Sequence, residues 1–207
     1  MIDSLPQNSQ LLELDKHLLS NSFKLQTNWH VITGAPCCGK TTLINQFAGK
    51  GFQTLPEVGR EYIEREIAKG RTLEEIRASN ITFARVIKDL QLEIEQGLPP
   101  VDVIFLDRAF PDSLTFFRLA GLNPNEILPD CFHHRYASVF VLDRFPVQKD
   151  CARIEDDVTA DLLDEGLACD YSALGYNVVR VPVLPAEERF EFVLDRLSER
   201  GLISSLE

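Results

Sequence analysis

The segment GAPCCGKT at residues 34–41 fits the phosphate-binding loop pattern G-x-x-x-x-G-K-[ST] without a gap. The apolar run WHVIT at 29–33 predicts a strand before it, and TTLINQFAG at 41–49 predicts a helix after it. In this arrangement the backbone N–H groups of the loop converge on phosphate oxygens, and the helix N-terminus adds its partial positive charge. The alternative is a glycine-rich turn that happens to precede a lysine, and the flanking strand and helix argue against it.

The loop supplies the candidate nucleotide-binding residues. Lys40 would reach the β- and γ-phosphates, and the Thr41 hydroxyl would bind Mg²⁺. Cys37 and Cys38 lie before a helix N-terminus, where thiols become reactive, so a redox switch is an alternative to a plain backbone role. We favour the backbone role, because the N–H groups of both residues would bind the phosphate. The candidate set is Gly34, Ala35, Pro36, Cys37, Cys38, Gly39, Lys40, Thr41 and Thr42.

The net charge of −11 over 207 residues restricts the partners of this chain. Duplexes are bound by a basic face, so nucleic-acid binding is disfavoured, and an acidic surface also disfavours docking on anionic membranes. No stretch approaches the roughly 18 apolar residues of a membrane span, and the N-terminal MIDSLPQNSQ does not resemble a signal peptide. The five cysteines form no C-x-x-C pair, which favours a reduced, cytoplasmic setting. The oligomeric state stays open.

Strand and helix patterns alternate along the chain, which is typical of a parallel sheet with helices on both faces. We expect a three-layer α/β fold with five parallel strands in a single domain, residues 1–207. Residues 1–28 would be an N-terminal extension and about 144–157 a lid. The other predicted strands cover 52–55, 101–106, 136–142 and 177–183, and the predicted helices cover 57–69, 111–120, 158–174 (interrupted at Gly166) and 186–200.

One further helix, a long one, is predicted between the second and third strands. Thr72 and Glu75 form a capping box, and apolar residues then recur three and four positions apart as far as Gln96. We interpret this stripe as a seam that faces the core, with a dimer seam as the alternative. Its members are Leu73, Ile76, Asn80, Phe83, Ile87, Leu90 and Ile94.

Charged residues follow the ends of the predicted strands, where ligands bind in parallel sheets. Asp107 could hold Mg²⁺ through water or accept a proton from a substrate hydroxyl; alternatively it caps a helix or pairs with Arg108. Glu57 could be the base for an acceptor hydroxyl, or only an acid that complements a helix dipole. Arg60 could clamp a substrate, or pair with Glu57 and Glu61.

The charged segment at 149–157 has the composition of a lid. Arg153 could reach the transferring phosphoryl group from there, and Arg144 is the rival candidate. The plain alternative is a solvated, charged turn.

Three motifs together resemble a known family: GAPCCGKTT at 34–42, PEVGREYI at 56–63 and LDRAFPDSL at 106–114. They are similar to the small "predicted ATPase" P-loop family, which is grouped with the ribosylnicotinamide kinase domain and more broadly resembles nucleoside and thymidylate kinases. The resemblance runs from about residue 29 to residue 197. It implies a P-loop NTPase fold of the nucleoside-kinase type.

The resemblance also implies roles for individual residues. Glu57 would be a base or a substrate ligand, Asp107 and Arg108 would be the charged pair after the third strand, and Arg153 would be a lid arginine. One departure concerns the loop, because many relatives carry glycine where Cys37 stands. If that position requires a positive φ, the cysteine is strained.

The sequence therefore predicts an enzyme, a kinase that uses ATP and Mg²⁺ to phosphorylate a hydroxyl of a small, nucleoside-like metabolite. The alternatives are an ATPase or GTPase, a nucleotide-driven switch, and a binding module without turnover. The Asn-Lys-x-Asp guanine motif of GTPases is absent, and Arg108 stands where mechanical ATPases carry an acid. The predicted catalytic residues are Lys40, Glu57, Asp107, Arg108 and Arg153, the substrate-binding residues Glu57, Arg60, Asp107 and Arg108, and the metal ligands Thr41 and Asp107.

Overall fold

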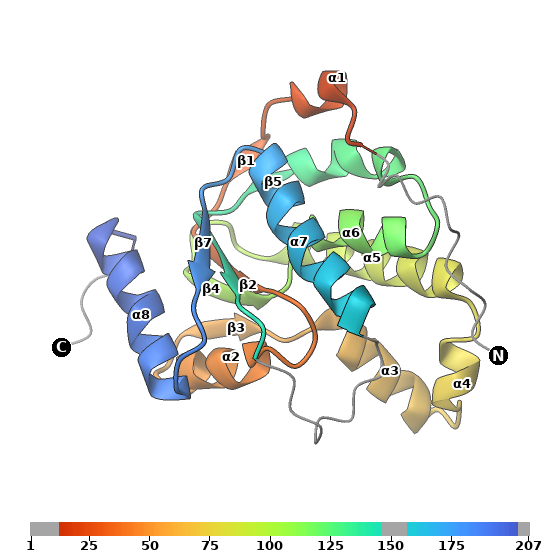
Figure 1. Ribbon diagram of the computed structural model, residues 1–207, viewed down its shortest axis with the longest axis horizontal. Helices are drawn as coiled ribbons and strands as arrows, with labels where there is room; N and C mark the ends of the chain where they lie inside the picture. The colour runs from red at the N-terminus through yellow and green to blue at the C-terminus, as the bar shows by residue number, and fades with distance from the viewer. Residues whose placement is uncertain (1–12, 146–156, 203–207) are drawn as a thin grey trace.

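A parallel sheet forms the centre of the molecule and confirms the five strands predicted from the sequence (Figure 1). The computed structural model describes residues 13–145 and 157–202. The strands are β2 (Trp29–Thr33), β3 (Gln53–Leu55), β4 (Ile104–Asp107), β6 (Ser138–Leu142) and β7 (Val178–Val181). Their spatial order is β3-β4-β2-β6-β7, so β2 lies in the middle.

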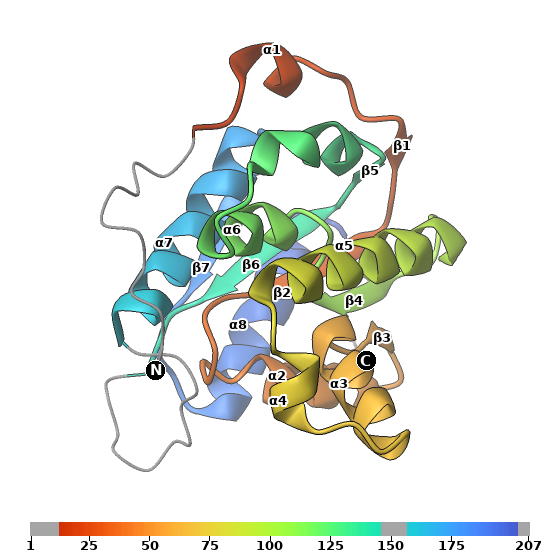
Figure 2. The same ribbon diagram turned by 90° about the vertical axis from the view of Figure 1, so that its right-hand side faces the viewer.

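Helices cover both faces of the sheet and complete the three layers (Figures 1 and 2). One face carries α2 (Lys40–Gly49) and α8 (Ala186–Glu199), and the other carries α5 (Asn80–Gly97), α6 (Asp112–Leu119) and α7 (Asp157–Ala173). At the β3 edge lie α3 (Val58–Ala68) and α4 (Leu73–Ile76). Among the described residues, no helix is both long and apolar enough to cross a bilayer.

Several short elements complete the fold. In the described part of the N-terminal extension, α1 (Lys16–Leu19) is followed by β1 (Leu25–Gln26), which pairs in parallel with β5 (His134–Arg135). Two 3₁₀ helices, η1 (Pro124–Glu126) and η2 (Leu128–Phe132), lead into β5. His134 of β5 is buried, and the centre of its ring lies 4.8 Å from that of the Trp29 ring.

Alternate residues of each central strand enter two separate cores. On β2, Trp29 and Val31 pack in the core beneath α6 and α7, whereas Ile32 packs in the core beneath α2 and α8. In the second core, Phe47 of α2 stacks on Phe105 of β4 with ring centroids 3.7 Å apart. Because both faces are covered, these strands are continuous apolar runs, and this made them recognisable in the sequence.

The sheet register brings three chain segments to one edge. Ile32 of β2 pairs with Asp107 of β4, and Thr33 pairs with Val141 of β6. The backbone N–H of Arg108 donates to the Ile32 carbonyl at 3.0 Å, so the chain after β4 continues beside the end of β2. The phosphate-binding loop pattern therefore begins between the residues that follow β4 and those that follow β6.

The prediction of one continuous helix after the capping box is wrong, because the structure has two helices there, α4 and α5. Both hydrogen bonds of the Thr72–Glu75 box are present, but they open only the four-residue α4. Ser79 then acts as a second N-cap, with its side chain accepting from the Thr82 N–H, and starts α5. The predicted core seam is interrupted there, because Leu73 and Asn80 are exposed. The fully buried side chains of α5 are polar: Gln91 and Glu95.

The predicted interruption at Gly166 does not occur, and α7 is continuous through it. A Cβ at this position would lie 2.7 Å from Cγ2 of Thr115 on α6. Glycine is therefore required by the close approach of two helices rather than by a turn. Most of the predicted lid at about 144–157 and residues 1–12 of the predicted N-terminal extension fall outside the described residues, so their roles stay predictions.

His30 makes the stability of this fold sensitive to acid. Its ring is fully buried on β2, Nδ1 contacts Ser138 Oγ at 2.8 Å, and Nε2 has no hydrogen-bond partner among the described residues. Burial lowers the pKa of His30 from 6.5 to about 4. Between these values the unfolded chain binds the proton and the folded chain does not, so stability rises with pH. We expect the free energy of unfolding to fall by up to about 3 kcal/mol from this residue as pH drops from 7 towards 4.

Urea denaturation across pH 4 to 7 measures this dependence. His30→Gln should flatten the curve, whereas His17→Gln, which alters an exposed histidine on α1, should leave its slope unchanged. Equal slopes for the wild type and His30→Gln would show that His30 titrates normally in the fold.

Candidate functional site

The segment 34–39 forms a tight turn between β2 and α2. Three of its residues have positive φ: Gly34 at 139°, Cys37 at 59° and Gly39 at 92°. A Cβ at Gly34 would lie 2.8 Å from the Leu142 carbonyl oxygen, so only glycine fits there. Gly39 is the N-cap of α2 and offers no side-chain hydrogen bond, which leaves the first amides of the helix available to an anion.

Lys40 is the first residue of α2, and its side chain folds back over this turn. Its Nζ donates to the Ala35 carbonyl at 2.9 Å and lies 3.8 Å from Cys38 Sγ. The residue is only 6% exposed, so its positive charge is held close to the loop rather than in solvent. A cation and a ring of amides thus face the same small volume, which suits a phosphate group.

Asp107 and Thr41 lie beside this volume. The Thr41 hydroxyl donates to Asp107 Oδ2 at 3.3 Å, while Asp107 Oδ1 is buried with no hydrogen-bond partner among the described residues. Burial and the charge of Glu57 raise the pKa of Asp107, against the opposing effect of Lys40. An orphaned carboxylate oxygen next to a threonine hydroxyl is a donor set that Mg²⁺ accepts, so these residues fit the ion.

Arg108 joins Glu57 to the interior of the protein. The arginine has a φ of 71° and is 7% exposed. Its Nε contacts Glu57 Oε1 at 3.3 Å, and its Nη1 contacts Asp112 Oδ1 at 3.2 Å. Burial by itself would raise the pKa of Glu57, but the charges of Arg108, Lys40 and Arg60 outweigh it and lower that pKa. Glu57 is therefore an ionised, fixed carboxylate at neutral pH.

Two buried carboxylates that the sequence did not single out hold the turn after β4. Asp112 accepts from Thr33 Oγ1, from the Ala109 N–H at 3.2 Å and from the Tyr171 hydroxyl, in addition to Arg108. Glu95 of α5 accepts from the Phe110 N–H at 2.8 Å. The only signal in the sequence was the position of Asp112 at the start of a helix.

A pocket of about 150 Å³ opens between α2 and α3. Four carboxylates line it, and Arg60 is the one basic residue among its lining residues. Its polar lining consists of Thr41, Asn45, Glu57, Arg60, Glu61, Glu64 and Asp107. The structure thus places Glu57, Arg60, Thr41 and Asp107 around one space, next to Lys40 and Arg108.

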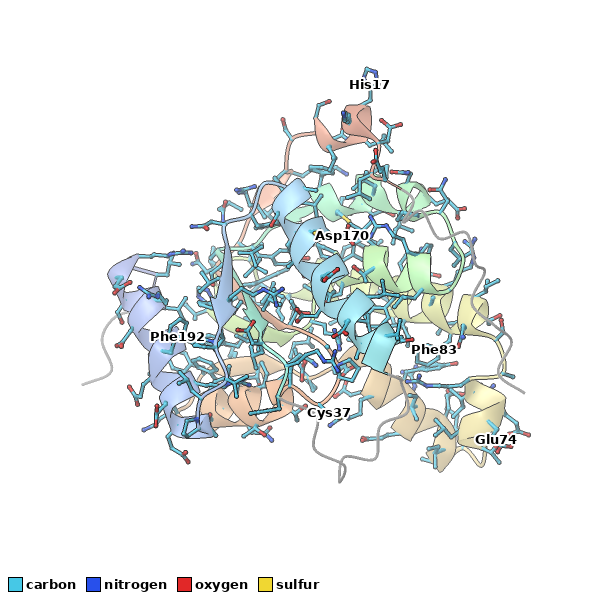
Figure 3. The ribbon with its side chains drawn as sticks, in the orientation of Figure 1. His17, Cys37, Glu74, Phe83, Asp170 and Phe192 are labelled. Atoms are coloured by element: carbon cyan, nitrogen blue, oxygen red, sulfur yellow. The ribbon has the colours of Figure 1, made fainter. Side chains whose placement is uncertain are left out.

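The structure describes one of the two arginines predicted as candidates for the transferring phosphoryl group. Arg153 lies outside the described residues, so its role stays a prediction. Its rival, Arg144, forms an ion pair with Asp161 of α7. Cys37 is exposed at the turn before α2, as Figure 3 shows, whereas Cys38 is buried.

The fold and the loop define a P-loop α/β protein with a kinase-like architecture. More narrowly, the chain belongs to the AAA-domain family, whose model matches residues 29–189. A search of curated proteins finds no match.

Solved structures with a similar fold include the NadR protein and two small-molecule kinases. The NadR protein in complex with NR is 17% identical with a TM-score of 0.62, and the match covers 87% of this chain and 52% of that one. Deoxyadenosine kinase from M. mycoides is 14% identical with a TM-score of 0.58, covering 83% and 99%. Shikimate kinase from Aquifex aeolicus is 16% identical with a TM-score of 0.51, covering 85% and 99%. The chain thus spans about half the length of NadR, and these likenesses concern the fold.

The positive φ at Cys37 yields a stability test. An L-residue in the left-handed region costs roughly 1–2 kcal/mol, more when it is β-branched, and glycine escapes this cost. We expect Cys37→Val to lower the free energy of unfolding by about 1–2 kcal/mol and Cys37→Gly to leave it unchanged or raised. Cys169→Val, at an exposed position of α7, is the matched control and should change stability by only a few tenths of a kcal/mol. Equal urea midpoints for the valine and glycine variants at Cys37 would contradict the strained conformation.

Proposed function

We propose that this protein is a kinase that transfers the γ-phosphoryl group of ATP, with Mg²⁺, to a hydroxyl of a small, nucleoside-like metabolite. The observation that carries the proposal is the meeting of Lys40, Thr41, Glu57, Asp107 and Arg108 at one edge of the sheet. The family and the fold support it, because similar structures hold nucleotides: NadR with NAD and AMP-PNP, and deoxyadenosine kinase with its products.

The loop residues Gly34 to Thr42 would bind the phosphates through their amides, and Lys40 would neutralise the β- and γ-oxygens. Thr41 and Asp107 would hold Mg²⁺, which supplies positive charge to the phosphate oxygens. Binding of Mg²⁺ would give the buried Oδ1 of Asp107, which has no hydrogen-bond partner among the described residues, a positively charged partner. Phosphoryl transfer needs little covalent help from a protein, so this positioning accounts for most of the expected rate enhancement.

Glu57 would orient the attacking hydroxyl and accept its proton. Its lowered pKa makes it a weak base but keeps it ionised, and a loose transition state requires orientation more than basicity. Arg108 would fix the Glu57 carboxylate, and its own position is fixed by Asp112.

The charge of the pocket limits the acceptor. Glu57, Glu61, Glu64 and Asp107 outnumber Arg60, so an anionic acceptor would be repelled. Arg108 does not reverse this balance, because Glu57 and Asp112 already neutralise it. The arrangement favours an acceptor that carries hydroxyls and no negative charge, which is consistent with a nucleoside and not with a nucleoside monophosphate.

The first test is a screen of nucleosides and other uncharged polyols with ATP and Mg²⁺, read by mass spectrometry of the phosphorylated product. We expect turnover with at least one acceptor. Lys40→Met and Asp107→Asn should each lower kcat by about 10²–10³-fold, and Asp107→Asn should also raise the Mg²⁺ concentration needed for half-maximal rate. ATP hydrolysis with no phosphorylated acceptor would instead support an ATPase or switch.

A second test separates Glu57 from the other acids of the pocket. Glu57→Gln keeps the shape of the side chain but removes its charge, and we expect kcat to fall by about 10²–10³-fold with little change in KM for ATP. Glu64→Gln, an exposed carboxylate on the same pocket wall, should change kcat less than about threefold. Equal losses in the two variants would show that the pocket acts by bulk charge alone.

A further inference from the structure

Arg189, in the first turns of α8, is buried beneath the phosphate-binding loop. It is 3% exposed, and all its hydrogen bonds go to main-chain carbonyls. Nη1 donates to the Cys38 carbonyl, Nη2 to that of Asp143 at 2.9 Å, and Nε to that of Pro182 at 2.9 Å. These carbonyls follow β2, β6 and β7, so a single guanidinium joins the chain segments that follow three neighbouring strands.

The hydrogen bond to Cys38 determines which way the next amide points. In a planar trans peptide the C=O of one residue and the N–H of the next point in opposite directions. Because the Cys38 oxygen points towards the Arg189 guanidinium, the Gly39 N–H points away from it, to the opposite side of the peptide. Amides on that side are the ones that bind phosphate oxygens.

Part of the loop adopts this shape against its conformational preference. Cys37 has a φ of 59°, which an L-residue disfavours, and Gly39 has a φ of 92° and no side chain to anchor it. A Cβ at Gly39 would lie 3.3 Å from Arg189 Nη1 and 3.4 Å from Phe145 Cε2. The guanidinium also lies 4.5 Å from the centre of the Phe145 ring, which covers it. The peptide is therefore held from behind by a tightly packed cation.

Arg189 also brings charge to this place. Among the described residues no carboxylate forms an ion pair with it, and Asp143 is the one carboxylate whose charge acts on its pKa, by raising it against the larger effect of burial. In a chain with a net charge of −11, a buried cation behind the loop favours an anion in front of it.

We propose that Arg189 is a positioning residue for nucleotide binding, which holds the Cys38–Gly39 peptide in the orientation that the β-phosphate requires. The inference rests on the nucleotide binding in the proposed function, and it does not depend on the identity of the acceptor. It predicts that Arg189 matters for the β-phosphate in particular, because the loop amides contact that group and not the nucleoside.

The test compares ADP with AMP, each with Mg²⁺, by isothermal titration calorimetry on the full chain. Arg189→Lys keeps the positive charge but cannot bond to three carbonyls at once. Arg189→Gln loses the charge as well as the set of three hydrogen bonds. For both variants we expect ADP affinity to fall at least tenfold and AMP affinity to change less than threefold. Arg196→Gln is the matched control: Arg196 lies on the same helix, over Phe192 and paired with Glu199, but is exposed, and both affinities should stay within twofold.

The results distinguish a positioning role of Arg189 from a general structural one. Equal losses for ADP and AMP would show a general structural role and overturn the proposal, and so would wild-type ADP affinity in Arg189→Lys, because charge without geometry would then suffice. If Arg189→Gln does not fold, the lysine variant decides alone. A wild-type protein that binds ADP but phosphorylates no acceptor would contradict the kinase assignment and leave the role of Arg189 intact.

Discussion

The site depends on one backbone constraint: the chain must leave the central strand β2 through a turn with three positive φ angles. Gly34 and Gly39 adopt these angles freely, whereas Cys37 does so against its preference. Such a turn needs support from its surroundings, and the middle position of β2 in the sheet supplies it. The segment after β4 lies on one side and the segment after β6 on the other.

The buried charges of the site are unequally matched. Arg108 is shared by the carboxylates of Glu57 and Asp112, so its own positive charge is fully compensated. Asp107 has a raised pKa and an oxygen without a hydrogen bond, whereas the ammonium of Lys40 and the guanidinium of Arg189 bond mainly to carbonyls. One buried anion and two buried cations are thus left to interact with ligands of opposite sign. An anionic nucleotide together with a divalent cation satisfies both needs at once.

The sequence predicted the parts of this structure that depend on local pattern. The strands were continuous apolar runs, and the loop had four fixed residues, so both could be found without tertiary information. The helix expected from Thr72 to Gln96 was wrong because Ser79 provides a second N-cap, and a cap in the middle of a periodic stripe is easily overlooked. Arg189 and Glu95 could not be found, because their contacts to Cys38 and Phe110 join separate elements and leave no local signature.

Strain and buried polar contacts occur together in this protein. Among the described residues, Cys37 and Arg108 are the two non-glycine residues with positive φ, and both lie in the candidate site. Each conformation costs free energy, and each is followed by a peptide group that a buried charged side chain holds: Arg189 binds the Cys38 carbonyl, and Asp112 binds the Ala109 N–H. Removing such a side chain leaves the strain in place without its support. Cys38 and Ala109 also belong to the two cores, but most side chains of both cores make none of these polar contacts. The site should therefore lose its geometry before the sheet loses its packing.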